Sequence, residues 1–181
     1  NNLAKKLRKK VSIGFRLNPN VDAKTHKNIS TGKAENKFGL SIKNFKFFLK
    51  TVKSFKNVKL DALSVHIGSQ ILNDAPFRKT LNVMSKLIKE LKLNLKYVDL
   101  GGGFGINYTD KEKPINLSKY SKLVHNFSKK LNCKIIFEPG RSIIGNTGLL
   151  ISKIQFIKKG ANKDFIIPVS YTHLTLPTSH N

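Results

Sequence analysis

Cysteine, acidic side chains and long apolar runs are scarce in this sequence of 181 residues. The one cysteine, Cys133, excludes an internal disulfide and a cysteine-rich metal site, so we expect no metal centre and a reducing compartment. No apolar run approaches the roughly 20 residues that cross a membrane, and no charged-then-apolar segment typical of a signal peptide opens the chain. We therefore expect a cytoplasmic protein without a membrane partner.

Arginine is also scarce, and this bears on the large excess of positive charge. Lys and Arg number 34 against 10 Asp and Glu, a formal net charge of +24, but only four of the 34 are arginine. Arginine is favoured for bidentate contacts to phosphates and bases, and aromatic side chains do not interleave the scattered lysines as a stacking platform requires. Lys, Asn, Ile and Phe share A/T-rich codons, which accounts for the charge without a partner. We expect no nucleic acid; a basic nucleic-acid-binding domain stays as an alternative, which a salt-dependent duplex-binding assay decides.

Apolar runs of strand length alternate with stretches of helical periodicity along the chain. Hydrophobic residues make up 39% of the sequence, enough for a packed core, and the length suits one domain. At least three strand–helix repeats predict a parallel sheet of βα units. The expected strands are 11–17, 60–66, 95–100, 133–137, 149–157 and 165–167. The expected helices are 1–10, 42–52 (capped by Ser41), 76–91 and 116–131 (capped by Asn116), and a long loop spans 20–39.

Unusual polar and small residues follow the first four of these strands. The carboxyl ends of parallel strands lie on one face, which holds the active site in a (β/α)₈ barrel, so we expect these residues to converge on one ligand. In particular, we expect His66, Gly103, Glu138 and Arg141 to cluster. The segments are Arg16–Pro19, His66–Gln70, Asp99–Gly105 and Glu138–Ser142.

The segments after the third and fourth strands are suited to bind an anion. Three consecutive glycines, Gly101–Gly103, expose backbone N–H groups and let an anion approach closely. Gly140 and Ser69 can donate hydrogen bonds to the same anion, and Arg141 can neutralise its charge. This combination predicts a phosphate cradle.

Two further side chains suit a basic heterocycle. Glu138 can pair with a cationic ring nitrogen, and His66 offers a flat face for stacking or an acid–base group. A phosphate plus a basic heterocycle indicates pyridoxal phosphate, whose protonated ring is an electron sink. Each feature alone has a plainer explanation, since glycine-rich turns are common, a lone histidine is more often a core or rim residue, and the glycines lack the G-x-G-x-x-G spacing. Their conjunction at successive strand ends favours the functional interpretation.

The same segments resemble the fold-type-III pyridoxal-phosphate decarboxylases, a family that includes enzymes acting on diaminopimelate, ornithine and arginine. The resemblance runs from residue 11 to about residue 148, in the family's order. Ser69-Gln70, the Ser30-Thr31-Gly32 loop and Gly105-Ile106-x-Tyr108 are more similar to the diaminopimelate branch than to the ornithine branch. The matching segments are Arg16–Pro19, Val21–Ala23, Ile29–Gly32, Lys37–Gly39, His66–Ile71, Asp99–Ile106 and Glu138–Ile143.

For the fold, the resemblance implies an α/β class, part of an alanine-racemase-like (β/α)₈ TIM barrel. We expect residues 1–167 to be roughly the second half of the pyridoxal-phosphate-binding barrel, beginning after the family's Schiff-base lysine and without its C-terminal β-domain. Residues 168–181 carry no charged side chain and depart from the family pattern. We expect them to be a non-native or disordered tail, with a genuine polar tail as the alternative.

For the site, the resemblance implies a role for each strand-end residue. His66 would stack on the cofactor ring and Glu138 would pair with the pyridinium nitrogen, and these two are the expected catalytic residues. Arg141 would contact both phosphate and substrate, and Arg16 would be a supporting residue near the cofactor. The expected cofactor-binding residues are His66, Ser69, Gly102, Gly103, Glu138, Pro139, Gly140 and Arg141.

For the function, the resemblance implies loss of CO₂ from the D-centre of meso-diaminopimelate, which gives L-lysine. The full-length enzyme would be a homodimer whose small-molecule partner is this amino acid. Without the Schiff-base lysine, we expect the 181-residue chain alone to be inactive. Two alternatives stay open: a decarboxylase of the same fold acting on ornithine, arginine or carboxynorspermidine, and a non-catalytic pyridoxal-phosphate-binding protein.

Overall fold

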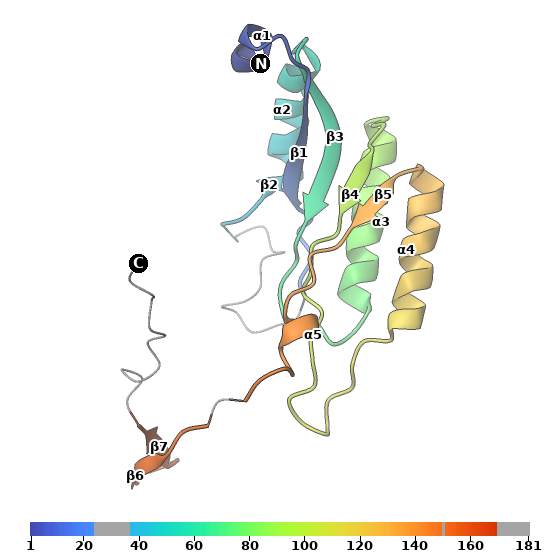
Figure 1. Ribbon diagram of the computed structural model, residues 1–181. Coiled ribbons are helices and arrows are strands. Elements are labelled where there is room, and N and C mark those ends of the chain that lie inside the picture. Colours follow the sequence, from blue (N-terminus) through green and yellow to red (C-terminus); the bar gives the residue numbers. More distant parts are fainter. Residues whose placement is uncertain (24–36, 150, 170–181) are drawn as a thin grey trace. The chain divides into compact units, whose positions relative to one another are not determined.

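The computed structural model describes residues 1–23, 37–149 and 151–169 (Figure 1). The chain divides into two compact units, residues 1–146 and residues 147–181, and each is described by itself. The loop segment Ile29–Gly32, which contributes to the family resemblance, and the tail from residue 170 onward lie outside the described residues. No helix within the described ranges is long and apolar enough to span a membrane.

The first unit is built on a five-stranded sheet in the order β2-β1-β3-β4-β5. Every neighbouring pair of strands is parallel, which confirms the predicted sheet of βα units. The bounds of the four longer predicted strands in this sheet hold to within two residues, whereas two short elements, β2 and α5, were not predicted. The elements are α1 (Asn2–Lys6), β1 (Val11–Asn18), β2 (Leu40–Ser41), α2 (Ile42–Lys53), β3 (Val58–Val65), α3 (Ala75–Glu90), β4 (Tyr97–Asp99), α4 (Leu117–Leu131), β5 (Lys134–Ile136) and α5 (Arg141–Ile144).

One face of the sheet is apolar and covered by helices. Leu63 and Val65 of β3 are 0% and 2% exposed, and the strand register places Leu17 of β1 and Val98 of β4 on the same face. Alternate residues of a strand point to opposite faces, so this face is continuous across the sheet. Buried side chains of α2, α3 and α4 complete the core: Phe45, Leu49, Phe77, Leu81, Met84, Leu87, Tyr120, Val124 and Phe127.

The opposite face is polar near the carboxyl ends of the strands. Arg16, Ser64 and Asp99 are in register across β1, β3 and β4, and they form a row that alternates with the buried residues. Because His66 follows Ser64 by two positions, it continues this polar face beyond the end of β3. The next row toward the strand starts consists of Gly14, Ala62 and Tyr97.

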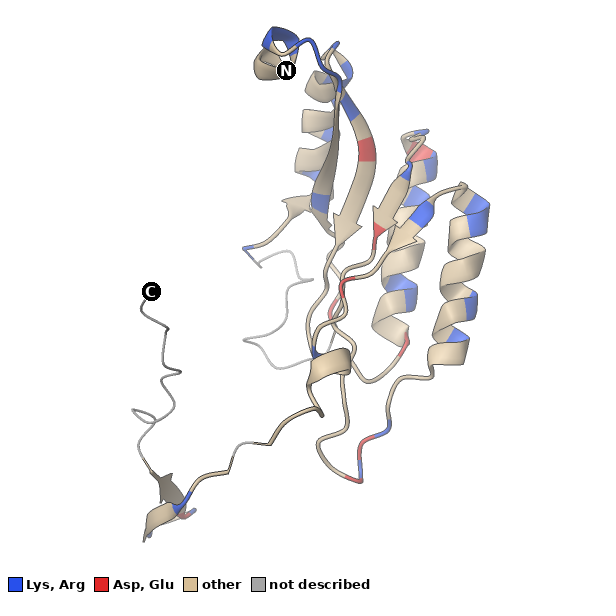
Figure 2. Ribbon diagram, in the orientation of Figure 1, with Lys and Arg blue, Asp and Glu red and all other residues tan. Residues whose placement is uncertain are grey.

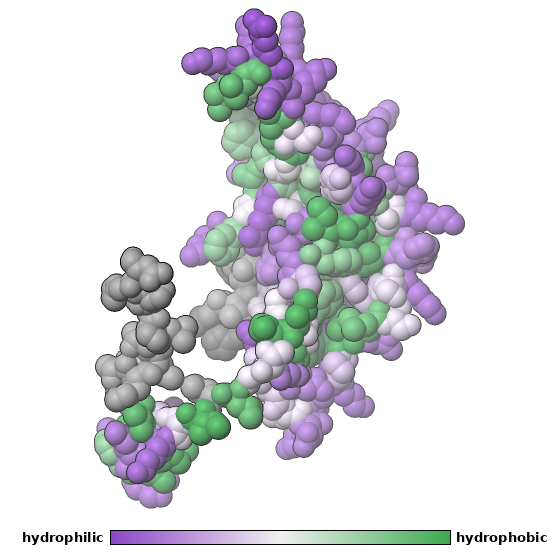
Figure 3. Space-filling view, in the orientation of Figure 1, coloured by the Kyte–Doolittle hydropathy of each residue, from purple (hydrophilic) through white to green (hydrophobic). Residues whose placement is uncertain are grey.

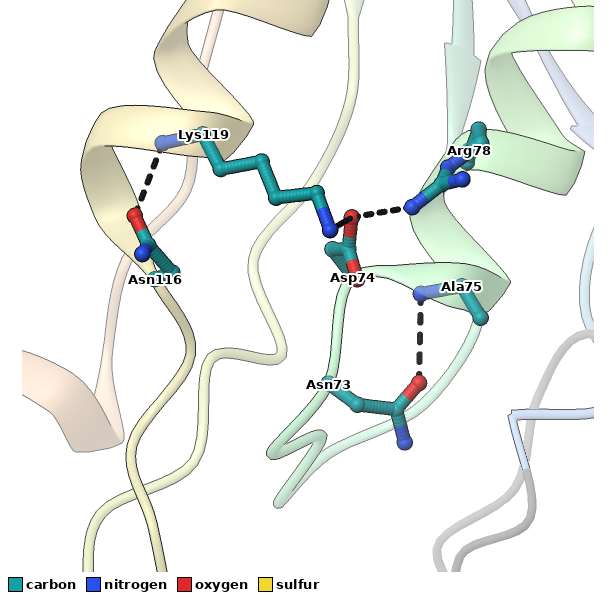
Figure 4. A network of polar contacts seen from close by, with 6 residues as sticks. All are labelled: Asn73, Asp74, Ala75, Arg78, Asn116 and Lys119. Atoms are coloured by element: carbon teal, nitrogen blue, oxygen red, sulfur yellow. Dashed lines mark hydrogen bonds and ion pairs between the residues drawn. The ribbon is translucent and has the colours of Figure 1, made fainter.

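Polar side chains mark where two of the helices begin, as the sequence predicted. The hydroxyl of Ser41 accepts a hydrogen bond from the Asn44 N–H at 3.1 Å at the start of α2. At the start of α4, the Asn116 side chain accepts from the Lys119 N–H at 2.8 Å (Figure 4). Each cap satisfies a backbone donor that has no partner within the helix.

Asp74 links the starts of α3 and α4. Its carboxylate accepts a hydrogen bond from the Arg78 guanidinium at 2.5 Å and lies 3.6 Å from the Lys119 ammonium (Figure 4). The hydrogen bond from Arg78 holds the pKa of the Asp74 carboxyl below its usual range. Exposed ion pairs add little stability, so we attribute the packing of the two helices mainly to Phe77 and Tyr120, whose ring centroids are 5.1 Å apart.

Charge and apolar surface are distributed differently over the first unit. Lys and Arg are spread over the helices and strands (Figure 2). Exposed apolar side chains gather over β5 and α5 (Figure 3), where Ile136, Phe137, Ile143 and Ile144 are 41–67% exposed. Since β5 is the last strand of this sheet, the edge that it forms within the described part of the first unit is apolar.

The second unit contains an antiparallel pair, β6 (Ile154–Lys158) and β7 (Phe165–Pro168). The strand predicted from residue 149 begins only at Ile154, and Leu149 is 92% exposed. Residues 159–164 connect the strands, closed by an ion pair of 2.7 Å between Lys159 and Asp164. Six residues are too few for the crossover that parallel strands need, so this pair forms a hairpin.

Candidate cofactor site

The loops that follow β3, β4 and β5 meet at the carboxyl end of the sheet. Beyond β4, the Leu100 N–H donates to the Ile136 carbonyl at 3.0 Å. The Glu138 N–H donates to the Gly101 carbonyl at 2.8 Å. The Gly101 N–H in turn donates to the Asp99 carboxylate at 2.8 Å, which closes the turn after β4. The glycine turn is therefore tied directly to the loop that carries Glu138.

Close approach of these backbones explains the run of three glycines. Gly101 and Gly103 have φ values of +66° and +94°, which favour glycine. A Cβ atom on Gly102 would lie 2.1 Å from the Glu138 carbonyl oxygen, and one on Gly103 would lie 2.2 Å from the Gly68 carbonyl oxygen. The glycines were expected to make room for an anion, and the structure shows that they also let three loops pack together.

His66 lies against the glycine turn, directly after β3. Its Nδ1 accepts a hydrogen bond from the Gly102 N–H at 3.3 Å, and the side chain is half-buried. A neutral imidazole that accepts at Nδ1 carries its proton on Nε2. The Gly102 N–H, expected among the groups around a phosphate, is thus directed to the histidine.

The charged side chains that act on His66 come from β1, from β4 and from the loop after β5. Burial lowers the pKa of His66 below its ordinary value, and the positive charge of Arg16 lowers it further. The carboxylates of Glu138 and Asp99 act in the opposite direction. The imidazole is therefore neutral at neutral pH, between one positive and two negative side chains.

Three expected site residues lie together in the loop after β5. Glu138, Pro139 and Gly140 are exposed, and a Cβ atom on Gly140 would meet nothing within 4 Å. The Glu138 carboxylate makes no hydrogen bond with the residues that the structure describes, although its charge acts on His66. Its oxygen atoms are therefore available to a ligand.

Arg141 opens the short helix α5 and contacts two neutral side chains. Its guanidinium donates to the Tyr108 hydroxyl at 3.0 Å and lies within 3.5 Å of the Gln70 side-chain oxygen. The guanidinium carbon is also 5.8 Å from the centroid of the Tyr108 ring. Gln70 belongs to the loop after β3, so Arg141 is joined to that loop as well as to its own.

The structure thus brings most of the expected site residues to one end of the sheet. His66, Gly102, Gly103 and Glu138 are in direct or near contact, and Pro139 is 3.6 Å from a Cβ atom placed on Gly102. Ser69 is half-buried beside the Gly68 carbonyl that Gly103 approaches. Gly140 and Arg141 follow Glu138 along the same loop.

Arg16 lies on the polar face rather than in the loops. It is in register with Ser64, two positions before His66, and its guanidinium carbon is 5.1 Å from the ring centroid of Phe38. Its charge reaches His66. The supporting role near the cofactor that the resemblance implies for Arg16 stays a prediction.

Two residues of the site, Gln70 and Tyr108, had no role in the sequence prediction. Their positions after β3 and β4 were a signal, because most of the other site residues lie in segments that directly follow a strand. Their contacts with Arg141 and Ile106 join residues that are 33 to 71 positions apart in the sequence. No local sequence pattern predicts contacts over that range.

Comparison with known proteins identifies the family. The family described as "pyridoxal-dependent decarboxylase, pyridoxal binding domain" matches residues 2–145. The chain belongs to this family. Its relatives include the diaminopimelate decarboxylase of Aquifex aeolicus, 39% identical over 92% of this chain and 40% of that protein. Another is the diaminopimelate decarboxylase of Helicobacter pylori strain J99, 41% identical over 91% of this chain and 41% of that protein.

Solved structures agree with this assignment. The crystal structure of Helicobacter pylori diaminopimelate decarboxylase complexed with L-lysine is 37% identical, with a TM-score of 0.78, and the match covers 92% of this chain and 42% of that one. The enzyme from M. jannaschii, also in complex with L-lysine, is 31% identical with a TM-score of 0.69, over 92% and 41% of the chains. This chain therefore spans about 40% of the length of the proteins it matches.

The residues present fit pyridoxal phosphate, the cofactor of this family. The neutral ring of His66 offers a face to a pyridine ring, and the Glu138 carboxylate is free to meet its nitrogen. At the other end, Arg141 and the Gly103 and Gly140 backbone are suited to a phosphate. The donor set therefore matches both ends of the cofactor.

We predict that Gly102→Ala disrupts the site, because the added methyl group would overlap the Glu138 carbonyl oxygen. In the full-length protein we expect the free energy of unfolding to fall by about 2 kcal/mol or more, as for other overpacked sites. Urea denaturation measures this. Gly148→Ala is the matched control, since a Cβ atom there meets nothing within 4 Å. Equal stability of the two variants would contradict the described packing.

We predict opposite effects of two neighbouring charges on His66. Arg16→Gln should raise the pKa of His66, because it removes a positive charge that disfavours the imidazolium, and Glu138→Gln should lower it. NMR titration of the imidazole ring in the full-length apoprotein measures both. Lys122→Gln, a charge removal on α4, is the control and should leave the titration of His66 unchanged. Shifts of the same sign in the first two variants would refute this electrostatic arrangement.

Proposed function

We propose that the protein to which this chain belongs decarboxylates meso-diaminopimelate at its D-centre and forms L-lysine. The observation that carries the proposal is the convergence of His66, Glu138 and Arg141 around one glycine turn at the carboxyl end of a parallel sheet. The identity of 39–41% to proteins named diaminopimelate decarboxylase supports this substrate over ornithine, arginine or carboxynorspermidine.

We assign the ring of the cofactor to His66 and Glu138. Pyridoxal phosphate, when bound, accepts the electron pair that departing CO₂ leaves behind. His66 stacks on the ring, and its lowered pKa keeps the imidazole neutral, so that it does not repel a protonated pyridine. The Glu138 carboxylate pairs with the pyridine nitrogen and holds a proton there. These two residues are the catalytic residues of the proposal within this chain.

We assign the phosphate of the cofactor to Ser69, Gly103, Gly140 and Arg141. The Ser69 hydroxyl and the glycine N–H groups donate hydrogen bonds, and Arg141 supplies the positive charge. Gly102 contributes differently, since its N–H orients His66. We also assign to Arg141 a contact with a carboxylate of the substrate.

This chain spans about 40% of the length of its relatives. We propose that the lysine that binds the cofactor covalently, and further contacts to the substrate, come from parts of the protein outside this chain. We therefore propose that the 181-residue chain alone forms no lysine, and that the full-length enzyme is a cytoplasmic homodimer.

A substrate panel tests the proposed reaction. The full-length protein, loaded with pyridoxal phosphate, is assayed for CO₂ release from meso-diaminopimelate, ornithine, arginine and carboxynorspermidine. We expect kcat/KM for meso-diaminopimelate to exceed the others by about 100-fold or more, because substrates that leave polar groups of the site unpaired are rejected strongly. A preference for another substrate would move the protein to that alternative. Cofactor binding without any turnover would make it a non-catalytic binding protein.

We predict that Glu138→Ala in the full-length protein lowers kcat about 100-fold or more, because the carboxylate acts on charge that develops during the reaction. Affinity for the cofactor, measured by equilibrium titration, should fall by less than about 10-fold. The control is Glu90→Ala, which removes an exposed carboxylate paired with Lys46 on the helices. Equal losses of affinity and turnover would instead make Glu138 a simple binding residue.

A further inference from the structure

Gln70 joins the loop after β3 to the loop after β4 through its side chain. Its amide nitrogen donates to the Ile106 carbonyl at 2.6 Å, and the Ile106 N–H donates to its amide oxygen at 3.2 Å. The side chain thus pairs with both backbone groups of one residue, as a neighbouring strand would. Gln70 has a φ of +59°, a left-handed conformation that is unfavourable for a residue with a Cβ atom, and these contacts hold it there.

The backbone beside Gln70 extends this pairing toward the glycine turn. The Ile71 N–H donates to the Gly103 carbonyl at 2.9 Å, and the Gly105 N–H donates to the Ile71 carbonyl at 3.0 Å. Ile71 is 1% exposed. Four hydrogen bonds therefore tie residues 70–71 to residues 103–106, and the far arm of the glycine turn depends on them.

The same amide oxygen also faces Arg141, within 3.5 Å of the guanidinium. The other side-chain partner of Arg141 is the neutral Tyr108 hydroxyl, and no ion pair with a carboxylate is formed within the described residues. Arg141 is thus oriented by groups that leave its charge uncompensated. A carboxylate at position 70, with almost the same shape, would pair with that charge and compete with any anionic ligand.

We propose that Gln70 is a positioning residue of the phosphate subsite. Its amide fixes the Gly103–Ile106 arm of the turn and orients Arg141 without neutralising it, so the arginine charge is kept for the phosphate. The identity of the anion rests on the proposed function. The link from Gln70 to Ile106 and Arg141 rests on the contacts alone.

Two substitutions separate the two roles of this residue. Gln70→Glu keeps the shape and adds a negative charge beside Arg141, whereas Gln70→Met keeps the length and removes the hydrogen bonds without adding charge. Gln155, in the exposed strand β6, is the only other glutamine of the sequence. Gln155→Glu and Gln155→Met are the matched controls, and all variants are made in the full-length apoprotein.

Calorimetric titration with pyridoxamine phosphate and with pyridoxamine measures the contribution of the phosphate group, since the two probes differ only there. In Gln70→Glu we expect the affinity ratio of the two probes to fall by about 10-fold or more, and in Gln70→Met by about threefold. Phosphorus NMR should show that the pKa of the bound phosphate rises in Gln70→Glu alone, a change that loss of structure by itself does not produce. If the affinity ratio of the two probes is unchanged in Gln70→Glu, the proposal that Gln70 leaves the charge of Arg141 available to the phosphate is overturned.

Hydrogen exchange of the Gly103–Tyr108 segment tests the positioning role without any ligand. We expect faster exchange at Ile106 in Gln70→Met and no change in Gln155→Met, and equal exchange would overturn this role. If the unaltered protein binds both probes with equal affinity, the phosphate subsite of the proposed function is refuted. The proposal that Gln70 leaves the charge of Arg141 available to the phosphate is then refuted as well. A difference in exchange would then support only the structural link.

Discussion

The contact between the glycine turn and the loop after β5 determines the geometry of the whole site. The Glu138 N–H binds the Gly101 carbonyl, and Gly102 has its α-carbon so close to the Glu138 carbonyl that no side chain fits. The same turn directs the Gly102 N–H at His66. Since the histidine and the glutamate are both located by this turn, neither can be placed independently of the other.

Electrical neutrality near the site is as important as charge. His66 is kept uncharged by burial and by Arg16, and Arg141 is held by an amide and a phenol rather than by a carboxylate. Positive side chains are plentiful in a chain with a formal charge of +24. Arg141 differs from most of them in its fixed orientation and in its uncharged partners. The site orients one such charge and leaves Glu138 as an accessible acceptor.

Much of the fold and of the candidate site could be predicted from the sequence, because both follow local patterns. Apolar periodicity gave the sheet strands and helices, Ser41 and Asn116 marked helix starts, and the strand ends marked the site. The hairpin β6–β7 was not predicted, although the two strands were expected and the short connection between them allows only antiparallel pairing. The pairing of Gln70 with Ile106 also escaped prediction, because it requires a turn geometry that appears only when two loops 36 residues apart meet.

The two faces of the sheet differ in the polarity of their side chains, and this bears on the order in which the protein folds during synthesis. The helix-covered face buries Leu63, Val65 and Val98, whereas the other face presents the row Arg16, Ser64 and Asp99. A nascent chain can therefore desolvate the helix-covered face as soon as α2, α3 and α4 have been synthesised. The polar row can meanwhile stay hydrated at little cost. On that side of the sheet, the apolar surface still in contact with water then includes the β5 edge, where Ile136 continues the row.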